Sequence, residues 1–440
     1  MTYRQTSAPV VLLLLAAACL ATGCTTVHMD ASEADYQAEL ERLQRELAEN
    51  PRSTETMRDL GVVYMRLENP TEAYEYLQQA YSMGSVDGKT LFWLGVANED
   101  LGRTSTAIRL YEAYPDVSDR SYRNLMQGRY DALIREMAHR EMRERLADEA
   151  AIGQTDVVPE IVAVFPLTYR GGDDRYEPLG RGMAEMIMLD LQSVGDLRVV
   201  ERVRLQALMS ELKLAESGYV DSTSAPRMGL LLQAGRVVSG SYNIISGDGL
   251  RLDAAYVETA NARINDLESR EDALDNFFQV EKQIVFDLLD RFGVELTEAE
   301  IERIESVPTQ NLQAFLAYCR GLRAEDEGDF EAAAEYFSQA ADLDPSFSEA
   351  GARAGRSQNI SIAQGPTTDF VATAMQFEAP PPAAAPDLNM LANRIGMISM
   401  GVQSGFIPGQ DARKPVAEQG EDAVLPTDPL PDPPQPPGGN

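Results

Sequence analysis

The sequence predicts a multidomain protein that has helical repeats, an α/β domain with a mixed sheet, one further repeat and a disordered Pro-rich tail. Between residues 31 and 149, apolar side chains recur at helical spacing. Residues 157–304 instead alternate strand-like apolar runs with amphipathic helices. From residue 357 to residue 440 the chain is rich in Pro, Ala, Gly and Asp, which bury too little apolar surface to offset the entropy of ordering.

The charge balance is strongly acidic. The 440 residues include 38 Lys and Arg against 70 Asp and Glu, which gives a formal net charge of -32. Such a surface repels nucleic acid and anionic lipid, so nucleic-acid binding is not expected. The usual effect of this acidity is a well-solvated surface that resists aggregation.

Residues 1–23 are predicted to be a signal peptide, because Arg4 precedes an apolar run too short to span a bilayer. The sequence "LATGC" that ends at Cys24 resembles the lipobox of bacterial lipoproteins, although Ala21 stands where that family prefers Leu. The resemblance implies that Cys24 becomes the lipidated first residue. Thr25 follows in place of the Asp that retains such proteins at the inner membrane, which implies a periplasm-facing outer-membrane lipoprotein.

Two alternatives to this interpretation of the N-terminus stay open. The leader can be an ordinary secretory signal, or Cys19 can be the acceptor, but cleavage at Cys19 leaves an apolar stub. If Cys24 is lipidated, Cys319 is the free thiol of the processed chain, and no disulfide forms within it.

A 34-residue period organises the predicted helical region, residues 24–150. The pair Leu60-Gly61 recurs 34 residues later as Leu94-Gly95, and Ala73 recurs at the same spacing as Ala107. This pattern resembles the tetratricopeptide repeat, in which small residues lie where paired helices approach most closely. Residues 119–149 continue as helix out of phase with the period and are predicted to form an end cap.

A further match to the tetratricopeptide repeat is predicted at residues 309–356. The residues on the preferred positions of the family are Gly321, Gly328, Ala333, Phe337, Ala340 and Pro345. One repeat cannot bury its apolar face alone. It is therefore expected to pack on residues 297–312, on the middle domain or on the N-terminal repeats.

The middle domain, residues 157–304, begins with the apolar run 160–169, which is suited to a buried strand. Two amphipathic helices follow, one on each side of a second strand at 196–201. A hairpin is predicted to turn at residues 246–249, and a last amphipathic helix closes the unit. Helices on a small mixed sheet make a two-layer or three-layer α/β domain.

The sequences "VVERVRLQALMSELKLAESG" and "AGRVVSGSYN" resemble the CsgG family of outer-membrane lipoproteins, named for the curli secretion channel. The core of that family is similar to the N-terminal domain of TolB. The residues that carry the resemblance are Glu201, Arg202, Leu205, Leu208, Glu211, Gly240 and Ser241. We expect Glu201 to favour the positive end of the next helix and Arg202 to pair with a nearby acid.

The chain also departs from the CsgG pattern. Gln233-Ala234-Gly235 replaces the usual Gly-Ala-Asp, and one hairpin is predicted where a secretion channel needs further membrane-crossing hairpins. These departures weaken the expectation of a pore and leave the fold expectation intact.

No catalytic residue, metal or cofactor is predicted. The two histidines, His28 and His139, cannot supply a His-based triad or a zinc site.

The leading hypothesis is a non-catalytic adaptor in envelope biogenesis or export, held to outer-membrane lipid by its acyl anchor. It binds other envelope proteins through its repeats and can form homo-oligomers. The alternatives are a ring-forming component of a CsgG-type secretion channel and, third, an enzyme. A short helix is also predicted at residues 388–403, within the tail.

Overall fold

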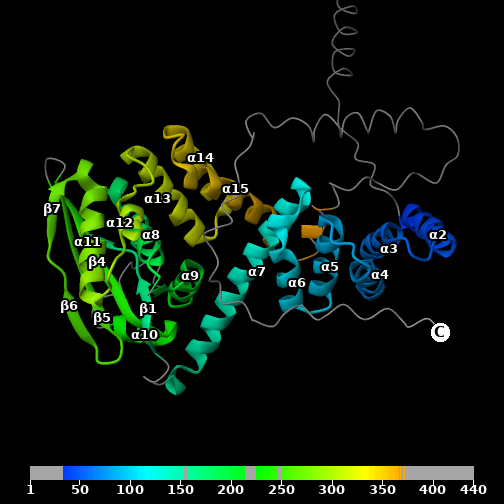
Figure 1. Ribbon diagram of the computed structural model, residues 1–440, viewed down its shortest axis with the longest axis horizontal. Helices are drawn as coiled ribbons and strands as arrows, with labels where there is room; N and C mark the ends of the chain where they lie inside the picture. The colour runs from blue at the N-terminus through cyan, green and yellow to red at the C-terminus, as the bar shows by residue number, and fades with distance from the viewer. Residues whose placement is uncertain are drawn as a thin grey trace, which may run out of the picture. The chain divides into compact units, whose positions relative to one another are not determined.

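The computed structural model describes residues 33–152, 157–195, 197–213, 224–245 and 249–365, and also Thr367, Phe370, Val371 and Ala374 (Figure 1). The predicted signal peptide, Cys24 and the predicted helix at 388–403 lie outside the described residues. Helix α2 (Glu33–Glu49) belongs to one compact unit, and the later described elements belong to a second. Among the described residues, the helices lack the combination of length and apolar character needed to cross a membrane.

The N-terminal repeats are pairs of antiparallel helices. The elements are α3 (Thr54–Arg66), α4 (Pro70–Ser82), α5 (Gly88–Asp100), α6 (Thr104–Glu112), η1 (Tyr114–Asp116), α7 (Arg120–Ala147) and η2 (Glu149–Ala151). Local chemistry sets their starts: the side chains of Ser53 and Asp87 accept hydrogen bonds from the first-turn amides of Thr56 and Thr90. Pro70 opens α4, where its missing N–H costs nothing.

Helix α7 differs from the end cap predicted at 119–149. It is a single helix of 28 residues that packs on α6 and also on α9 of the middle domain. Its N-terminal half therefore closes the repeats, whereas Ala138 and Met142 enter the apolar core beneath the sheet.

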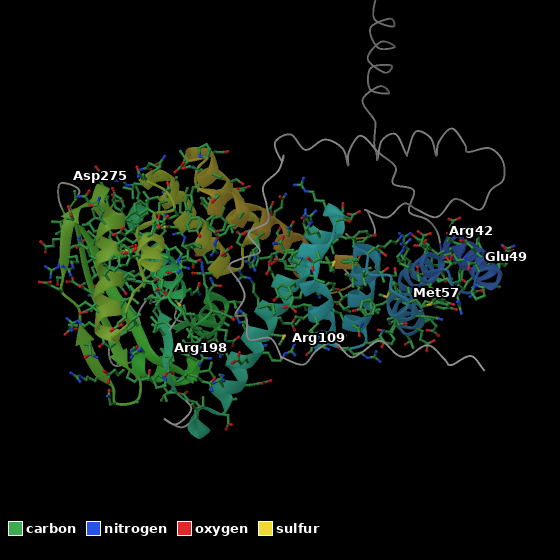
Figure 2. The ribbon with its side chains drawn as sticks, in the orientation of Figure 1. Arg42, Glu49, Met57, Arg109, Arg198 and Asp275 are labelled. Atoms are coloured by element: carbon green, nitrogen blue, oxygen red, sulfur yellow. The ribbon has the colours of Figure 1, made fainter. Side chains whose placement is uncertain are left out.

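The middle domain is built on one mixed sheet. Its strands are β1 (Val158–Val164), β2 (Thr168–Tyr169), β3 (Arg198–Val199), β4 (Ala234–Ile245), β5 (Gly249–Glu258), β6 (Arg263–Asp266) and β7 (Arg270–Ala273). The strand order is β3-β1-β4-β5-β6, with β2 paired to β4 and β7 paired to β5. Strands β1, β2, β3 and β4 pair in parallel, and β5, β6 and β7 add antiparallel. Figure 2 labels Arg198 in the edge strand β3.

Alternate residues of the strands face two apolar layers. Val162, Val164 and Val238 face the core that contains α8 (Leu179–Gln192) and α11 (Phe277–Phe292). Ala163, Phe165 and Val237 face the core that contains α9 (Arg202–Glu211) and α10 (Ala225–Leu232). The sequence left both a two-layer and a three-layer arrangement open, and the structure has three layers.

Three details of the middle domain differ from the prediction. Pro166 lacks an N–H, so the predicted run 160–169 is divided into β1 and the short β2. Strands β6 and β7 were not predicted, because their mostly polar sequences show no apolar alternation. Helix α10 was missed, although Pro226 in its first turn is a helix-start signal.

The C-terminal repeat connects the two larger parts. Its elements are α12 (Glu298–Glu305), α13 (Leu312–Glu327), α14 (Phe330–Leu343) and α15 (Ser348–Ala363). The middle domain that precedes it also contains the short helices η4 (Asp174–Tyr176) and η5 (Leu274–Asn276). Helix α13 packs on α8, and α15 packs on α7, so the repeat uses both the middle domain and the N-terminal repeats (Figure 1). Ile304 of α12 is fully buried in the core that α8 and α13 share.

The predicted start of the disordered tail at residue 357 is wrong. Helix α15 continues to Ala363, and Phe370 and Ala374 are buried in the core of the N-terminal repeats. Composition suggested an early boundary because the chain becomes rich in Pro, Ala, Gly and Asp after residue 357. However, Ile360 and Ala363 are one helical turn apart, and both are buried. Residues beyond Ala374 lie outside the described part of the chain.

Candidate functional site: repeat surfaces and the charge network that joins them

The small residues of the repeats lie at close helix contacts. A Cβ on Gly61 would overlap Leu77, one on Gly95 would overlap Tyr111, and one on Gly321 would lie 2.6 Å from Phe337. In each case a glycine of the first helix meets a large side chain of the second. The alanines at the matching positions are fully buried: Ala73, Ala107, Ala333 and Ala340.

Two further repeat positions lie where helices of the C-terminal repeat end. Gly328 ends α13 with a φ of 78°, a left-handed conformation that a side chain would strain. Pro345 follows α14 directly after its cap residue Asp344 and is exposed.

The first N-terminal repeat carries an aromatic surface. Tyr64 of α3 and Tyr76 of α4 stack with ring centroids 5.5 Å apart, and the guanidinium of Arg103 lies 4.4 Å from the ring centroid of Tyr74. These tyrosines are only half-buried, and the nearby turn exposes Met83 and Val86. Aromatic rings that combine apolar area with a polar tip are favoured in protein interfaces.

The second N-terminal repeat is different, because its first helix, α5, is buried on nearly every side. Phe92, Trp93 and Tyr111 are each fully buried, so they serve packing. A helix that is apolar all round has neighbours all round. Helices α6 and α7 and the buried residues beyond α15 supply these neighbours.

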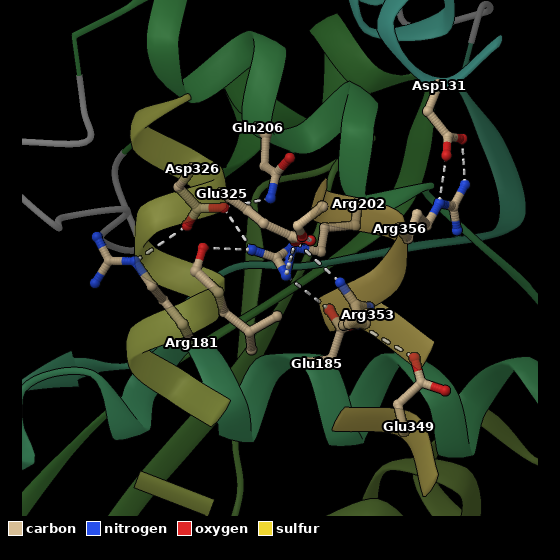
Figure 3. Close-up of polar contacts among 12 residues, drawn as sticks. Asp131, Arg181, Glu185, Arg202, Gln206, Glu325, Asp326, Glu349, Arg353 and Arg356 are labelled. Carbon is tan, nitrogen blue, oxygen red and sulfur yellow. Dashed lines mark hydrogen bonds and ion pairs between the residues drawn. The ribbon is translucent and has the colours of Figure 1, made fainter. Parts of the chain in front are cut away.

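A buried network of charges lies where the middle domain meets the C-terminal repeat (Figure 3). Arg202 of α9 donates to Asp326 Oδ1 at 2.5 Å and to the carbonyl of Leu322 at 3.0 Å, both on α13. It also donates to Glu185 Oε2 of α8 at 3.3 Å. Arg202 therefore links three helices that come from distant parts of the sequence.

Arg353 of α15 completes this network from the opposite side. Its guanidinium donates to Glu325 Oε2 at 3.0 Å and also to Glu185 (Figure 3). The side chains of Glu185 and Glu325 are 5% and 3% exposed, so both carboxylates are held between two arginines away from water. Arg181 adds a bond of 3.0 Å from its Nε to Asp326 Oδ2.

The electrostatics of the network favour the charged forms. Burial acts to lower the pKa of Arg202, but the carboxylates of Asp326, Glu185 and Glu325 outweigh burial and raise that pKa above its ordinary value. Burial likewise acts to raise the pKa of Glu325, whereas Arg353 and Arg202 lower it overall. The pairs are thus held ionised, and each charge depends on its partners.

A small cavity adjoins the network at the carboxyl end of β1. It has a volume of ≈ 20 Å³ and is lined in part by Arg181, Glu185, Arg202, Gln206 and Asp326. This volume suits one water molecule and is far too small for an organic substrate.

The residues that carry the CsgG resemblance do not form one cluster. Glu201 stands at the N-cap position of α9, and Arg202 enters the charge network. Glu211 at the other end of α9 accepts hydrogen bonds from His139 Nδ1 at 3.1 Å and Arg143 Nη1 at 3.0 Å of α7. The core and strand members of the set are Leu205, Leu208, Gly240 and Ser241.

Gly240 marks a close strand contact, because a Cβ there would lie 2.5 Å from the carbonyl oxygen of Asp253 on β5. Ser241 pairs with Asp253 on β5 and with Thr168 on β2. Both residues therefore position strands.

Sequence reasoning missed most of the network. Glu185, Glu325 and Arg353 were not singled out, although Glu185 stands within the apolar helix sequence "GMAEMIML". An acidic residue on the buried face of a helix is expensive unless it is paired. That placement is the signal by which Glu185 could have been found.

This arrangement defines a class of protein in which repeat surfaces and an α/β domain are connected by shared helices. Comparison with known families gives three matches. Residues 162–244 match the model of the curli production assembly/transport component CsgG, and residues 58–121 and 321–347 match models of the tetratricopeptide repeat. No curated protein matches the sequence. The chain combines a CsgG domain with tetratricopeptide repeats, which supports a protein-interaction or secretion-related role.

Proposed function

We propose that the protein is an outer-membrane lipoprotein that acts as a non-catalytic adaptor in envelope assembly or export. In this proposal, Cys24 carries the acyl anchor and the folded parts face the periplasm. The N-terminal repeats bind another envelope protein, and the CsgG domain docks or forms homo-oligomers. The lipobox-like sequence "LATGC" and the matches to both families support the proposal.

The observation that carries the adaptor proposal is the aromatic surface of the first repeat. Tyr64, Tyr74 and Tyr76 stay half-exposed, whereas Trp93 and Tyr111 of the second repeat are fully buried. These half-exposed tyrosines, together with exposed Met83 and Val86 in the turn after α4, offer a partner apolar area and hydrogen-bonding tips.

Affinity capture from solubilised envelopes tests this proposal. The full-length protein should retain partners that the double variant Tyr64→Ala/Tyr76→Ala loses, because removal of interface aromatics commonly costs about 2 kcal/mol or more. Tyr176→Ala, a half-buried tyrosine of the CsgG domain, is the matched control and should retain them. Unchanged capture by the double variant, with Trp93 fluorescence intact, contradicts the proposal.

The anchor is tested separately. Metabolic labelling with a fatty-acid analogue should mark the wild-type protein and Cys19→Ser, whereas Cys24→Ser should lose the label and leave the membrane fraction. Label that survives in Cys24→Ser but disappears in Cys19→Ser moves the anchor to Cys19 and contradicts the assignment.

The second candidate function is a ring-forming component of a CsgG-type secretion channel, which the CsgG match over residues 162–244 favours. Detergent-extracted particles that form rings with a transmembrane band support this candidate. A monomer released by Cys24→Ser counts against it and favours the adaptor.

A further inference from the structure

A later part of the same chain packs against Phe92 of α5 and Arg129 of α7, on a surface that we call the groove. Phe370 and Ala374 are 1% and 2% exposed and belong to the core of the N-terminal repeats. Both positions are helical, and helical residues four apart in sequence lie on one face. The inner surface of a helical-repeat array is where such proteins bind extended partners. Here Phe370 and Ala374 cover part of the surface that α5 and α7 form.

Aromatic and cationic groups hold Phe370. Its ring lies 5.5 Å from that of Phe92, at an interplanar angle of 69°, which is a favourable edge-to-face contact. The guanidinium of Arg129, on α7, lies 5.3 Å from the centroid of the same ring. Phe92 also contacts Tyr122, with ring centroids 5.6 Å apart, so the pocket is formed by α5 and α7 together.

Arg129 also recognises the end of α15. Its Nη1 donates to the carbonyls of Ala363 at 2.8 Å and Gly365 at 2.9 Å. The last carbonyls of a helix have no partner within the helix and carry the negative end of its dipole. One arginine therefore binds a helix C-terminus and the aromatic residue that follows seven positions after Ala363.

The groove remains electrostatically satisfied without its occupant. Glu99 Oε2 accepts from Arg129 Nη2 at 2.6 Å, Glu99 Oε1 accepts from Arg129 Nε at 3.1 Å, and Tyr111 donates to Glu99 at 2.7 Å. The side chains of Arg129 and Glu99 are 6% and 5% exposed, respectively. Departure of the segment leaves this ion pair intact, so no unpaired buried charge results. Directly after α15, Gly365 turns the chain with a φ of +105°, which glycine adopts without strain.

We propose that this groove is a binding site for a helical segment of another envelope protein, and that Ala363, Gly365, Phe370 and Ala374 occupy it as an intramolecular ligand. The partner segment offers free carbonyls at a helix C-terminus and an aromatic side chain about seven residues later. It binds by displacing Phe370. This inference rests on the proposed adaptor function and adds a second, self-covered surface to the exposed tyrosines.

The covalent link to α15 explains why the internal segment occupies the groove in the isolated chain. A segment joined directly to α15 is present at an effective concentration of about 1 mM, so a free peptide at micromolar concentration competes poorly. The apparent affinity of the groove is reduced by the small fraction of molecules in which it is open. A change that weakens the internal segment should therefore raise the affinity for an external one.

Peptide binding by the full-length protein tests the proposal. The probe is a fluorescein-labelled peptide of residues 358–376, followed by fluorescence anisotropy. Phe370→Ala should bind it about tenfold more tightly than wild type or better. The matched control Ile362→Ala, which shortens an exposed apolar side chain of α15, should bind it as weakly as wild type. Phe370→Ala/Arg129→Met and a peptide carrying the Phe370→Ala change should both lose the gain.

Binding by folded Phe370→Ala that is no tighter than binding by wild type overturns the proposal. A second measurement needs no variant: in wild type, the amides of Phe370, Val371 and Ala374 should exchange with solvent about 100-fold faster than those of α5. Equal exchange rates make the segment a permanent part of the core and also overturn it. Both experiments use purified protein. Failed partner capture with successful peptide exchange therefore rejects only the adaptor function, and the reverse result rejects only this inference.

Discussion

The two ends of α15 make different kinds of junction. Near its middle, Arg353 and Arg356 pair with carboxylates of three helices: Glu185 of α8, Glu325 of α13 and Asp131 of α7. At its far end, Ala363 packs into the apolar core of the N-terminal repeats. The charged junction depends on every member being present, whereas the apolar one responds to shape and contact area.

The largest expected effect tests the charged junction. Arg202→Met leaves Asp326, Glu185 and Glu325 without one of their cations and should lower the free energy of unfolding by about 3–5 kcal/mol. Urea unfolding measures this loss. The control Arg251→Met removes a surface pair with Asp253, 47% and 42% exposed, and should cost less than about 1 kcal/mol. Equal losses in the two variants would show that burial of the network has no special consequence.

The next effect tests the shape of the contact between α7 and α15. A Cβ on Gly128 overlaps the backbone carbonyl of Asn359, so Gly128→Ala should cost about 1–3 kcal/mol. Gly355, on the facing helix α15, has open space where a Cβ would lie, and Gly355→Ala should stabilise by about 0.5–1 kcal/mol. Thermal unfolding of the two variants separates the predictions by sign. A stabilising Gly128→Ala contradicts the close crossing.

The smallest effect is a pH dependence that separates two buried glutamates. Burial acts to raise the pKa of Glu325, but Arg353 and Arg202 outweigh it and lower the pKa below the ordinary 4.5. Its contribution to stability is therefore present above about pH 4.5 and is lost as the pH falls through the folded-state value. The loss caused by Glu325→Gln should accordingly shrink as the solution becomes more acidic.

Glu281 of α11 gives the opposite sign. It is fully buried, and burial raises its pKa well above 4.5, although Lys282 Nζ lies 3.2 Å from Oε2. Its contribution is complete below about pH 4.5 and is lost as the pH rises toward the folded-state value. Glu281→Gln should thus become more stable than wild type as the pH rises. Parallel pH profiles for the Glu281 and Glu325 variants contradict the assignment.

Local patterns predicted most of the helices, the main strands and the close repeat contacts, whereas α10 was missed. Helix α8 is one of the two predicted amphipathic helices, and its apolar residues Met183 and Ile187 are buried, because a helix of period 3.6 presents one stripe to its core. Gly61 and Gly95 could be found because they repeat at a fixed interval. These signals are all contained within short windows of sequence.

The charge network could not be predicted in this way, because its partners are distant in the sequence. Arg202 bonds to Asp326, 124 residues away, and Arg353 to Glu185, 168 residues away. The sequence predicted that Arg202 pairs with an acid, but it did not identify Asp326 as that acid. Phe370 was hidden for a related reason: its burial depends on contacts with α5 and α7, which are distant from it in the sequence.

The central claim is that α7 and α15 join the CsgG domain and the repeats of the second compact unit into one cooperative body. Two probes report on separate regions: Trp93, the only tryptophan, reports on the N-terminal repeats, and buried Cys319 reports on the contact of α13 with α8. In Cys19→Ser/Cys24→Ser protein, loss of Trp93 fluorescence and exposure of the Cys319 thiol should follow the same urea transition. Two transitions with different midpoints would show that the parts unfold independently and would contradict the account.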